Sequence, residues 1–169
     1  MTLWRLSYRA DPEALPIADR HYNRQKPGTP QFVPPGRCLV LKWGDPVTAV
    51  WVTSWPYPEY VKHAWPGAWM NSMFRKESKG IASDMIRQAV SCTRHIWPVV
   101  PDLGMVSFID PLHVKPVMTR GRPTWARSYF QAGFLHVGYT KGGLWVMQML
   151  PEAMPEAEHP STPLFGENE

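Results

Sequence analysis

The sequence is poor in cysteine and contains no long hydrophobic run. Its two cysteines, Cys38 and Cys92, belong to no CxxC or Cys/His spacing, which argues against a disulfide framework and against a zinc site. No apolar run approaches the roughly 18 residues of a membrane span, and charged residues interrupt the first twenty positions, where a signal peptide would have an apolar core. We therefore expect a soluble intracellular protein in which both cysteines are small buried hydrophobes.

Internal repeats are also absent, and the length of 169 residues fits one globular domain. The chain is instead rich in proline and tryptophan, with 19 and 9 residues. Both types are spread through apolar segments rather than through polar low-complexity sequence. This pattern predicts a compact fold with rigid loops that carry many aromatic side chains.

Basic residues are absent from one part of the chain, and this divides the net charge. Residues 151–169 contain five glutamates and no Lys or Arg, whereas residues 1–150 hold all 18 basic residues and nine acidic ones. The first part therefore carries +9 and the second −5, which together give the formal net charge of +4. A charge of +9 on residues 1–150 suits a polyanionic partner such as nucleic acid. Because residues 151–169 lack apolar periodicity, we expect residues 1–150 to form the domain and 151–169 a disordered tail.

Alternating and β-branched runs predict seven strands, and apolar residues at helical spacing predict three helices. Asp11 followed by Pro12 is typical of a helix start, and Gly133 is typical of a helix end. Proline-rich loops are expected at 23–36, 55–67 and 111–123. The expected strands are 3–9, 38–43, 47–54, 68–74, 104–110, 134–140 and 144–150, and the expected helices are 13–21, 81–97 and 124–132.

One strand-to-helix turn has the composition of an anion site. The segment from Phe74 to Ala82 joins an expected strand to the longest helix and contains Lys76, Lys79 and Gly80. Free backbone N–H groups and the helix dipole at such a turn hold phosphates and pyrophosphates. Many turns of this type bind no ligand, so a purely structural turn remains an open alternative at this point.

The order of these elements resembles the GNAT acyltransferase fold, which binds acyl-coenzyme A on the turn after its fourth strand. Glu77 to Ala82 is similar to the family's Gln/Arg-x-x-Gly-x-Gly/Ala motif except at its first position, and Ala126 to Phe134 resembles the family's tyrosine-containing helix that ends in Gly-Phe. The resemblance implies an α/β fold, a single GNAT-like domain with a central mixed, mostly antiparallel sheet of six to seven strands flanked by helices.

The same resemblance implies acetyl-coenzyme A as the cofactor. Tyr129 then lies beside the coenzyme sulfur and protonates the departing thiolate. From the residues alone, Tyr129 is equally compatible with a packing role in an amphipathic helix. The residues implied to bind the coenzyme are Phe74, Arg75, Ser78, Lys79, Gly80, Ile81, Ala82 and Tyr129.

A narrower resemblance covers most of the body of the chain. Asp19 to Gln25, Gly104 to Asp110, the Tyr129 helix and Tyr139 to Leu144 are similar to the Mom-type DNA-modification proteins of phages and prophages. Those proteins place a carbamoyl-type group on N6 of adenine and shield phage DNA from restriction, in the cytoplasm of the bacterial host.

This second resemblance implies dependence on acetyl-coenzyme A and on iron(II). His21, Tyr22 and Asp110 correspond to the catalytic or iron-binding corner, and groups of these types suit ferrous iron as well as proton transfer. The alternative is structural: His21 and Tyr22 are also compatible with a packing pair at a helix end, and Asp110 with the cap of a turn.

Adenine in DNA as a substrate places demands on the surface. The base must leave the duplex and stack on aromatic side chains, while basic residues neutralise phosphates. For each tryptophan, packing in the core is the alternative. The candidates for stacking are Trp55, Tyr57, Trp65, Trp69 and Trp125, and the candidates for DNA binding are Arg20, Arg24, Lys26, Lys115, Arg120 and Arg122.

Three functions are compatible with these observations. The leading hypothesis is a Mom-like enzyme that modifies N6 of adenine in phage or prophage DNA. The first alternative is a GNAT N-acetyltransferase acting on a small-molecule or protein amine. The second is a non-catalytic nucleic-acid-binding module with a GNAT-like fold, with which the departure from the motif at Glu77 is compatible.

Overall fold

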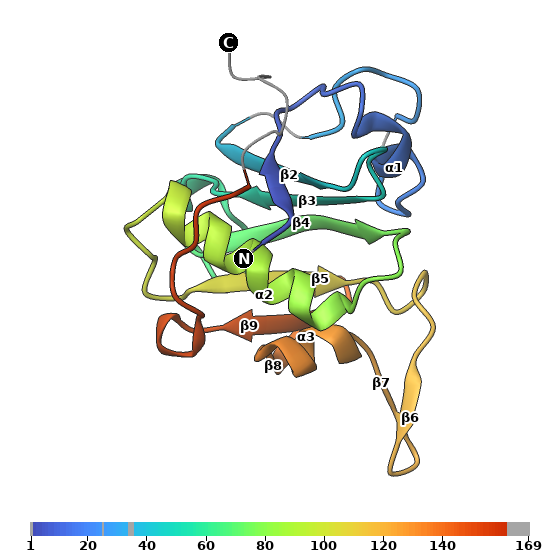
Figure 1. The fold of residues 1–169 in the computed structure, drawn as a ribbon. Coiled ribbons are helices and arrows are strands. Elements are labelled where there is room, and N and C mark those ends of the chain that lie inside the picture. The colour runs from blue at the N-terminus through green and yellow to red at the C-terminus, as the bar shows by residue number, and fades with distance from the viewer. Residues whose placement is uncertain (1, 25, 34–35, 162–169) are drawn as a thin grey trace.

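The computed structural model describes residues 2–24, 26–33 and 36–161 and shows one α/β domain (Figure 1). Its centre is a seven-stranded sheet with the strand order β1-β2-β3-β4-β5-β9-β8. β4 and β5 run parallel, whereas the other neighbouring pairs run antiparallel. The expected fold class, a mixed and mostly antiparallel sheet flanked by helices, is confirmed.

The expected strands and helices all have counterparts, with shifted ends. The strands are β1 (Trp4–Leu6), β2 (Cys38–Trp43), β3 (Ala49–Ser54), β4 (Trp69–Lys76), β5 (Met105–Ile109), β6 (Val117–Thr119), β7 (Arg122–Thr124), β8 (Leu135–Tyr139) and β9 (Trp145–Met149). The helices are α1 (Leu15–Asp19), α2 (Ala82–Ile96) and α3 (Arg127–Ala132), with the 3₁₀ turns η1 (Pro58–Tyr60) and η2 (Pro151–Ala153). Gly133 ends α3 with a φ of 107°, as expected.

α1 begins later than the Asp11-Pro12 pair predicts. Asp11 starts a turn instead: its Oδ1 accepts a hydrogen bond from the Glu13 N–H at 2.9 Å, and its backbone C=O accepts from the N–H groups of Ala14 and Leu15. The helix therefore starts one turn further along the chain, with Ala14 at its N-cap and proline in its first turn.

A β-hairpin occupies part of the segment expected to be a loop, and it projects from the domain (Figure 1). β6 and β7 pair antiparallel, with Met118 opposite Pro123. Arg120 and Gly121 form the turn and have φ values of 52° and 78°. Positive φ at both central residues is the geometry of a tight two-residue hairpin. The prediction of a loop over residues 111–123 is therefore wrong for β6 and β7.

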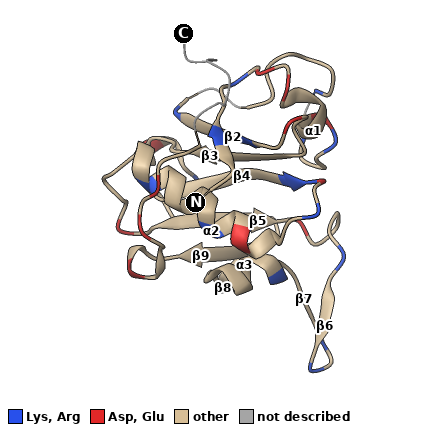
Figure 2. Cartoon of the chain, in the orientation of Figure 1, with Lys and Arg blue, Asp and Glu red and all other residues tan. Residues whose placement is uncertain are grey.

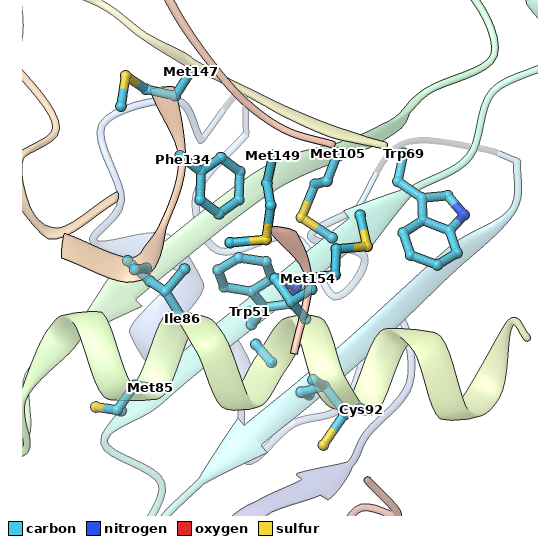
Figure 3. Packing of buried hydrophobic residues seen from close by; sticks show 14 of the residues in the cluster. Trp51, Trp69, Met85, Ile86, Cys92, Met105, Phe134, Met147, Met149 and Met154 are labelled. Carbon is cyan, nitrogen blue, oxygen red and sulfur yellow. The ribbon is translucent and has the colours of Figure 1, made fainter. Parts of the chain in front are cut away.

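The sheet separates two cores. Along β2 and β3, Leu41 and Trp51 belong to the core under α2, whereas Val40 and Val50 belong to the core under α1. This alternation follows from the strand itself, because successive side chains point to opposite faces. Figure 3 shows the first core, in which α2 contributes Met85, Ile86 and Cys92 against Trp51, Trp69 and the methionines of β5 and β9.

Residues 151–161 are ordered and packed on the domain, contrary to the expected disordered tail. Met154 is buried in the first core. The Glu158 N–H donates to the Ser91 carbonyl in α2, and the Thr2 N–H donates to the Glu158 carboxylate at 2.8 Å. One buried methionine and a few hydrogen bonds hold the segment, so no apolar repeat marks it in the sequence. Residues 162–169 lie outside the described residues.

The two cysteines differ in their surroundings. Cys92 is buried, and burial raises the pKa of its thiol to about 12. Cys38 is only half-buried, with its sulfur 3.5 Å from the Ser54 hydroxyl, so the expectation of burial holds for Cys92 alone. Among the described residues, no helix is long and apolar enough to cross a membrane.

Candidate functional site

The parallel strands β4 and β5 diverge and leave a cavity between them. Their pairing ends at Asn71 and Ser107, although β4 continues to Lys76 and β5 to Ile109. The cavity, called the cleft below, has a volume of about 330 Å³. It is lined by β4 and β5 at its sides, by α3 and by the segment that follows α1, including Phe74, Ser107, Tyr129, His21 and Tyr22.

A larger cavity of about 670 Å³, called the side pocket below, adjoins the cleft. The loop after α1 contributes Gln31, Phe32 and Val33, and Asp110 and Leu144 lie on its other side. Tyr22, Asn23, Phe108 and residues 71–73 of β4 line both cavities. The two spaces therefore meet at the middle of β4.

The middle of β4 is irregular. Opposite β3, the register shifts so that Ser72 is the extra residue of a β-bulge between Asn71 and Met73. Side chains bind the backbone carbonyls here: the Asn71 amide donates to Val52 and Met73, and the Asn23 amide donates to Ser72 at 2.7 Å. Bulges interrupt a ladder and re-aim the chain beside active sites. This bulge lies where the cleft and the side pocket meet.

Tyr129 reaches into the cleft from α3 and donates a hydrogen bond to Oδ1 of Asn71. Ser107 of β5 donates to the same oxygen at 3.1 Å. Burial raises the pKa of Tyr129, although its interaction with Ser107 opposes the shift. The phenol is therefore protonated over the neutral pH range, which is the state a proton donor requires.

His21 and Tyr22 form an aromatic corner beside the cleft together with His113. Tyr22 stacks on His21, with ring centroids 4.6 Å apart, and on His113, at 5.6 Å. Nδ1 of His113 lies 2.7 Å from Oδ2 of Asp110, and the Leu112 N–H donates to the other carboxylate oxygen. These two hydrogen bonds lower the pKa of Asp110. Asp110 is therefore both a turn cap and an anchor for His113.

The surroundings of His21 and Tyr22 favour their neutral forms. Burial lowers the pKa of His21, the hydrogen bond with Asn23 raises it, and the positive charge of Arg75 lowers it further. Burial raises the pKa of Tyr22, a backbone hydrogen bond with Asp110 lowers it, and the Asp110 charge raises it again. Nδ1 of His21 lies 2.6 Å from Oδ1 of Asn23, whose amide nitrogen donates to Ser72. An amide oxygen only accepts, so this shorter contact favours the tautomer with the proton on Nδ1 and the lone pair on Nε2, whereas the Asn23 backbone N–H, 3.3 Å from Nδ1, favours the opposite one.

The predicted iron ligands do not form a metal site as they are placed here. Over the described residues, no group of three or more His, Cys, Asp or Glu side chains is arranged to hold a metal ion. Nδ1 of His21 is engaged by Asn23 and both oxygens of Asp110 are hydrogen-bonded, whereas Nε2 of His21 is not the atom that contacts Asn23. The dependence on iron(II) that the resemblance implies stays a prediction, and the proposed reaction contains no step at a metal.

Glu77, the departure from the GNAT motif, joins the corner to the end of β4. Its carboxylate accepts two hydrogen bonds from Arg20, both at 2.7 Å, and one from Arg75 at 2.9 Å. Arg20 directly follows α1. Its ion pair with Glu77 therefore holds the segment that contains His21 and Tyr22 against the end of β4. Arg75, predicted to bind the coenzyme, is therefore partly committed to Glu77.

The remaining predicted coenzyme residues divide into two groups. Phe74 and Tyr129 line the cleft. Ser78, Lys79, Gly80, Ile81 and Ala82 lie outside its lining, in the turn that leads into α2. α2 has no side-chain cap at its N-terminus, so its first backbone N–H groups have no partner within the helix or from a capping side chain. These groups remain available for an anion.

Replacing Glu77 should change how stability depends on pH. Hydrogen bonds from Arg20 lower the pKa of Glu77 to about 2, from 4.5; desolvation opposes this shift, and the hydrogen bond and charge of Arg75 add to it. A lowered pKa in the folded state means that the pairs stabilise the fold above pH 4.5 and lose this effect as the pH falls towards 2. Glu77→Gln should therefore be less stable than the wild type at pH 7, and the difference should shrink over that interval.

Urea unfolding at a series of pH values measures this difference. Asp102→Asn, which removes an exposed acid from a loop outside the cluster, is the matched control. A difference between Glu77→Gln and the wild type that stays constant from pH 7 to pH 2 would show that the arginines do not act through the ionised carboxylate.

The predicted DNA-binding residues are not equally placed for phosphates. Lys26 lies exposed at the side pocket, and Lys115, Arg120 and Arg122 are exposed at or on the β6–β7 hairpin. Arg20 is already paired with Glu77. Arg24, predicted to bind DNA, is not placed to reach a phosphate. Its side chain is 6% exposed and donates to Asp19 at 2.8 Å and to the Thr29 carbonyl, so it holds the loop after α1 in place.

The aromatic candidates for stacking are mostly structural. Trp69 is fully buried in the core, so its predicted role at the surface is wrong. Trp55 packs edge-on against Trp69, and Trp125 packs against Trp145 while also lining the cleft. Trp65 is half-buried against Phe108, and Tyr57 is exposed beneath the guanidinium of Arg37. Tyr22 and Phe108 are the aromatic residues that line both cavities.

Three residues of the site were not expected from the sequence. Asn71 is a buried polar residue in the middle of a strand, and Ser107 is its buried partner. A polar residue inside an apolar strand is a detectable signal, but its partner lies 36 residues away. His113 carried a local signal, because it follows Asp110 at the i+3 spacing that lets a turn join the two side chains.

Comparison with known proteins found no similar protein. No protein-family model, no curated protein and no solved structure matches the chain.

Proposed function

We propose that the protein is a GNAT-like, Mom-like transferase that uses acetyl-coenzyme A to modify the N6 amino group of adenine in phage or prophage DNA, and so protects the DNA from restriction. One observation carries the proposal. The diverging strands β4 and β5 form a cleft that brings Tyr129, His21 and Tyr22 together and opens into a larger side pocket. This arrangement suits a reaction between two bound substrates.

The cleft is the proposed site of the acyl thioester, and the turn before α2 is the proposed site of the pyrophosphate. Acetyl-coenzyme A, when bound, supplies an activated acetyl group, and direct transfer of this group to N6 gives an acetylated base; a carbamoyl-type product needs a further nitrogen that this step does not supply. The uncapped backbone N–H groups at the start of α2 suit the pyrophosphate, and Lys79 in the preceding turn adds positive charge. Phe74 offers an apolar surface between the two, at the end of β4.

Tyr129 and His21 divide the proton chemistry in this proposal. His21 is held neutral by burial, and its Nε2 lone pair is available to take a proton from the attacking amino group. Tyr129 keeps its proton at neutral pH and is available to protonate the departing thiolate. Ser72, the extra residue of the β-bulge, lines both the cleft and the side pocket.

The side pocket is the proposed site of the extruded adenine. Its volume of about 670 Å³ lies within the range of roughly 300–1,000 Å³ typical of ligand pockets. Tyr22, Phe32 and Phe108 provide aromatic surfaces, and Asn23 and Gln31 provide amide groups, which suit stacking and recognition of a base edge. The charge of +9 on residues 1–150 supports a polyanionic substrate over a small neutral amine.

Nucleoside analysis of DNA from cells that express the protein tests the proposal. Mass spectrometry of the hydrolysed DNA should reveal an adenine nucleoside of increased mass that is absent from cells expressing Tyr129→Phe. Unmodified adenine, together with DNA-independent turnover of a simple amine by the purified protein, would instead establish an ordinary N-acetyltransferase. Calorimetry that shows no binding of acetyl-coenzyme A would leave only the non-catalytic module.

A further inference from the structure

The β6–β7 hairpin is an exposed, two-stranded arm with a rigid base. None of its residues is buried: Met118 is 63% exposed and Val117 43%. At the base, the Trp125 indole N–H donates to the Val114 carbonyl at 2.9 Å, and the Trp125 ring packs on Trp145 in the core. A two-stranded ribbon without further strands is only marginally stable in water. Apolar side chains exposed on such a ribbon are typical of a surface that binds a partner.

The arm and the chain that follows it carry basic but no acidic residues up to Glu152. Between Asp110 and Glu152 the sequence has no acidic residue and five basic ones, of which Lys115, Arg120 and Arg122 lie at the base and tip of the arm. Figure 2 shows Lys and Arg without Asp or Glu along the arm. Within the described part of the chain, neither Arg120 nor Arg122 forms a salt bridge. The charge is therefore complementary to an extended polyanion.

The arm begins at the proposed reaction site. Val117 and Thr124, which face each other at its base, both line the cleft, as does Lys115. Asp110 and His113 lie immediately before it in the chain. A partner that holds the arm is consequently held at the mouth of the cleft.

We propose that the β6–β7 hairpin is a DNA-docking arm that enters the major groove of the duplex beside the reactive adenine, with Arg120 and Arg122 on flanking phosphates. This inference rests on the proposed function. The major groove is about 12 Å wide and admits a two-stranded ribbon. It is also the groove in which adenine displays its N6 amino group, so an arm in this groove brings the cleft to the side of the duplex from which that group is reached.

Dimethyl sulfate protection combined with salt titration tests the arm on the full-length protein and a duplex of about 30 base pairs. This reagent methylates guanine N7 in the major groove and adenine N3 in the minor groove, so one experiment reports on both grooves. The wild type should protect guanine N7 over a few base pairs next to the bound site. Arg120→Asn/Arg122→Gln should lose this protection. Asparagine keeps a residue that tolerates positive φ at position 120.

The same double variant should bind duplex DNA with a weaker salt dependence. Each phosphate contact contributes about 0.9 to the slope of log K against log salt, so losing two contacts should reduce the slope by about 1.8. Lys62→Gln removes an exposed positive charge from a different loop and should leave the slope and the protection unchanged.

Three results would overturn the inference. Protection and slope equal to the wild type in the double variant would remove the arm from the interface while leaving DNA binding intact. Protection confined to adenine N3 would place the protein in the minor groove. No binding of duplex DNA by the wild type, with unmodified adenine in the nucleoside analysis, would overturn the arm and the proposed function together.

Discussion

Tyr129→Phe should slow the cleavage of acetyl-coenzyme A in the presence of DNA by about 10²- to 10⁴-fold, the range that a positioned proton donor contributes. In the proposed reaction the departing thiolate is protonated by Tyr129, a phenol of the cleft whose pKa is raised by burial. Phenylalanine keeps the ring that packs edge-on against Phe134, at 5.2 Å between centroids. The KM for acetyl-coenzyme A should therefore change little while kcat falls.

The hydroxyl of Tyr129 also has a structural partner, and the control must separate the two roles. Ser107→Ala removes the other hydroxyl that donates to Oδ1 of Asn71. Each single hydrogen bond contributes roughly 0.5–1.5 kcal/mol to stability, so the two variants should lose similar stability in urea unfolding. Only Tyr129→Phe should lose the rate.

Release of free thiol, followed with a thiol-reactive dye, measures the rate for both variants. Equal losses of kcat in Tyr129→Phe and Ser107→Ala would mean that the Asn71 network orients the cleft and that Tyr129 transfers no proton. An unchanged rate in Tyr129→Phe would remove the tyrosine from the reaction altogether.

The sheet was predictable from the sequence because its signal is local. In β2 and β3 most residues on both faces are apolar, with valines on the α1 side and Leu39, Leu41 and Trp51 on the α2 side. Runs of this kind have a strand interpretation that does not depend on distant contacts. The same holds for α2, in which Met85, Ile86, Ala89 and Val90 are buried at helical spacing.

The β6–β7 hairpin was missed because its stabilising features are not apolar. Its strands are three residues long and carry no buried side chain, so hydrophobic periodicity is absent. Threonine contacts support it instead: Thr119 and Thr124 lie 3.1 Å apart across the strands, and Thr124 donates to the Val117 carbonyl. The remaining sequence signal for a hairpin was the short Arg-Gly turn between β-branched residues. Two nearby prolines made a loop the more natural interpretation.

The corner of the candidate site was predictable as residue types but not as an arrangement. His21, Tyr22 and Asp110 do lie near each other, yet the ring that links them belongs to His113. Glu77 pairs with both Arg20 and Arg75, and Arg20 lies 57 residues away from it in the chain. Such partners depend on where α1 packs relative to β4, and a sequence pattern does not contain that distance.

Gly104→Ala should destabilise the protein by more than about 4 kcal/mol, a loss reached only when a specific structural rule is broken. Gly104 precedes β5 with a φ of +66°, and a Cβ at this position would lie 2.0 Å from the backbone oxygen of Met149 in β9. The chain has no freedom to move away, because the Gly104 carbonyl accepts from the Trp69 N–H at 2.9 Å. The clash would thus lie between the backbones of two neighbouring inner strands, at the start of β5 and the end of β9.

Gly143→Ala separates the clash from the cost of positive φ. Gly143 has a φ of +89° in the turn between β8 and β9, and nothing lies within 4 Å of a Cβ built there. Its replacement should cost only the roughly 1–2 kcal/mol of a left-handed residue. Urea unfolding compares the two variants directly. If Gly104→Ala is no less stable than Gly143→Ala, then β5 and β9 are able to separate at this end, and the sheet that fixes the opening of the cleft is less rigid than its register implies.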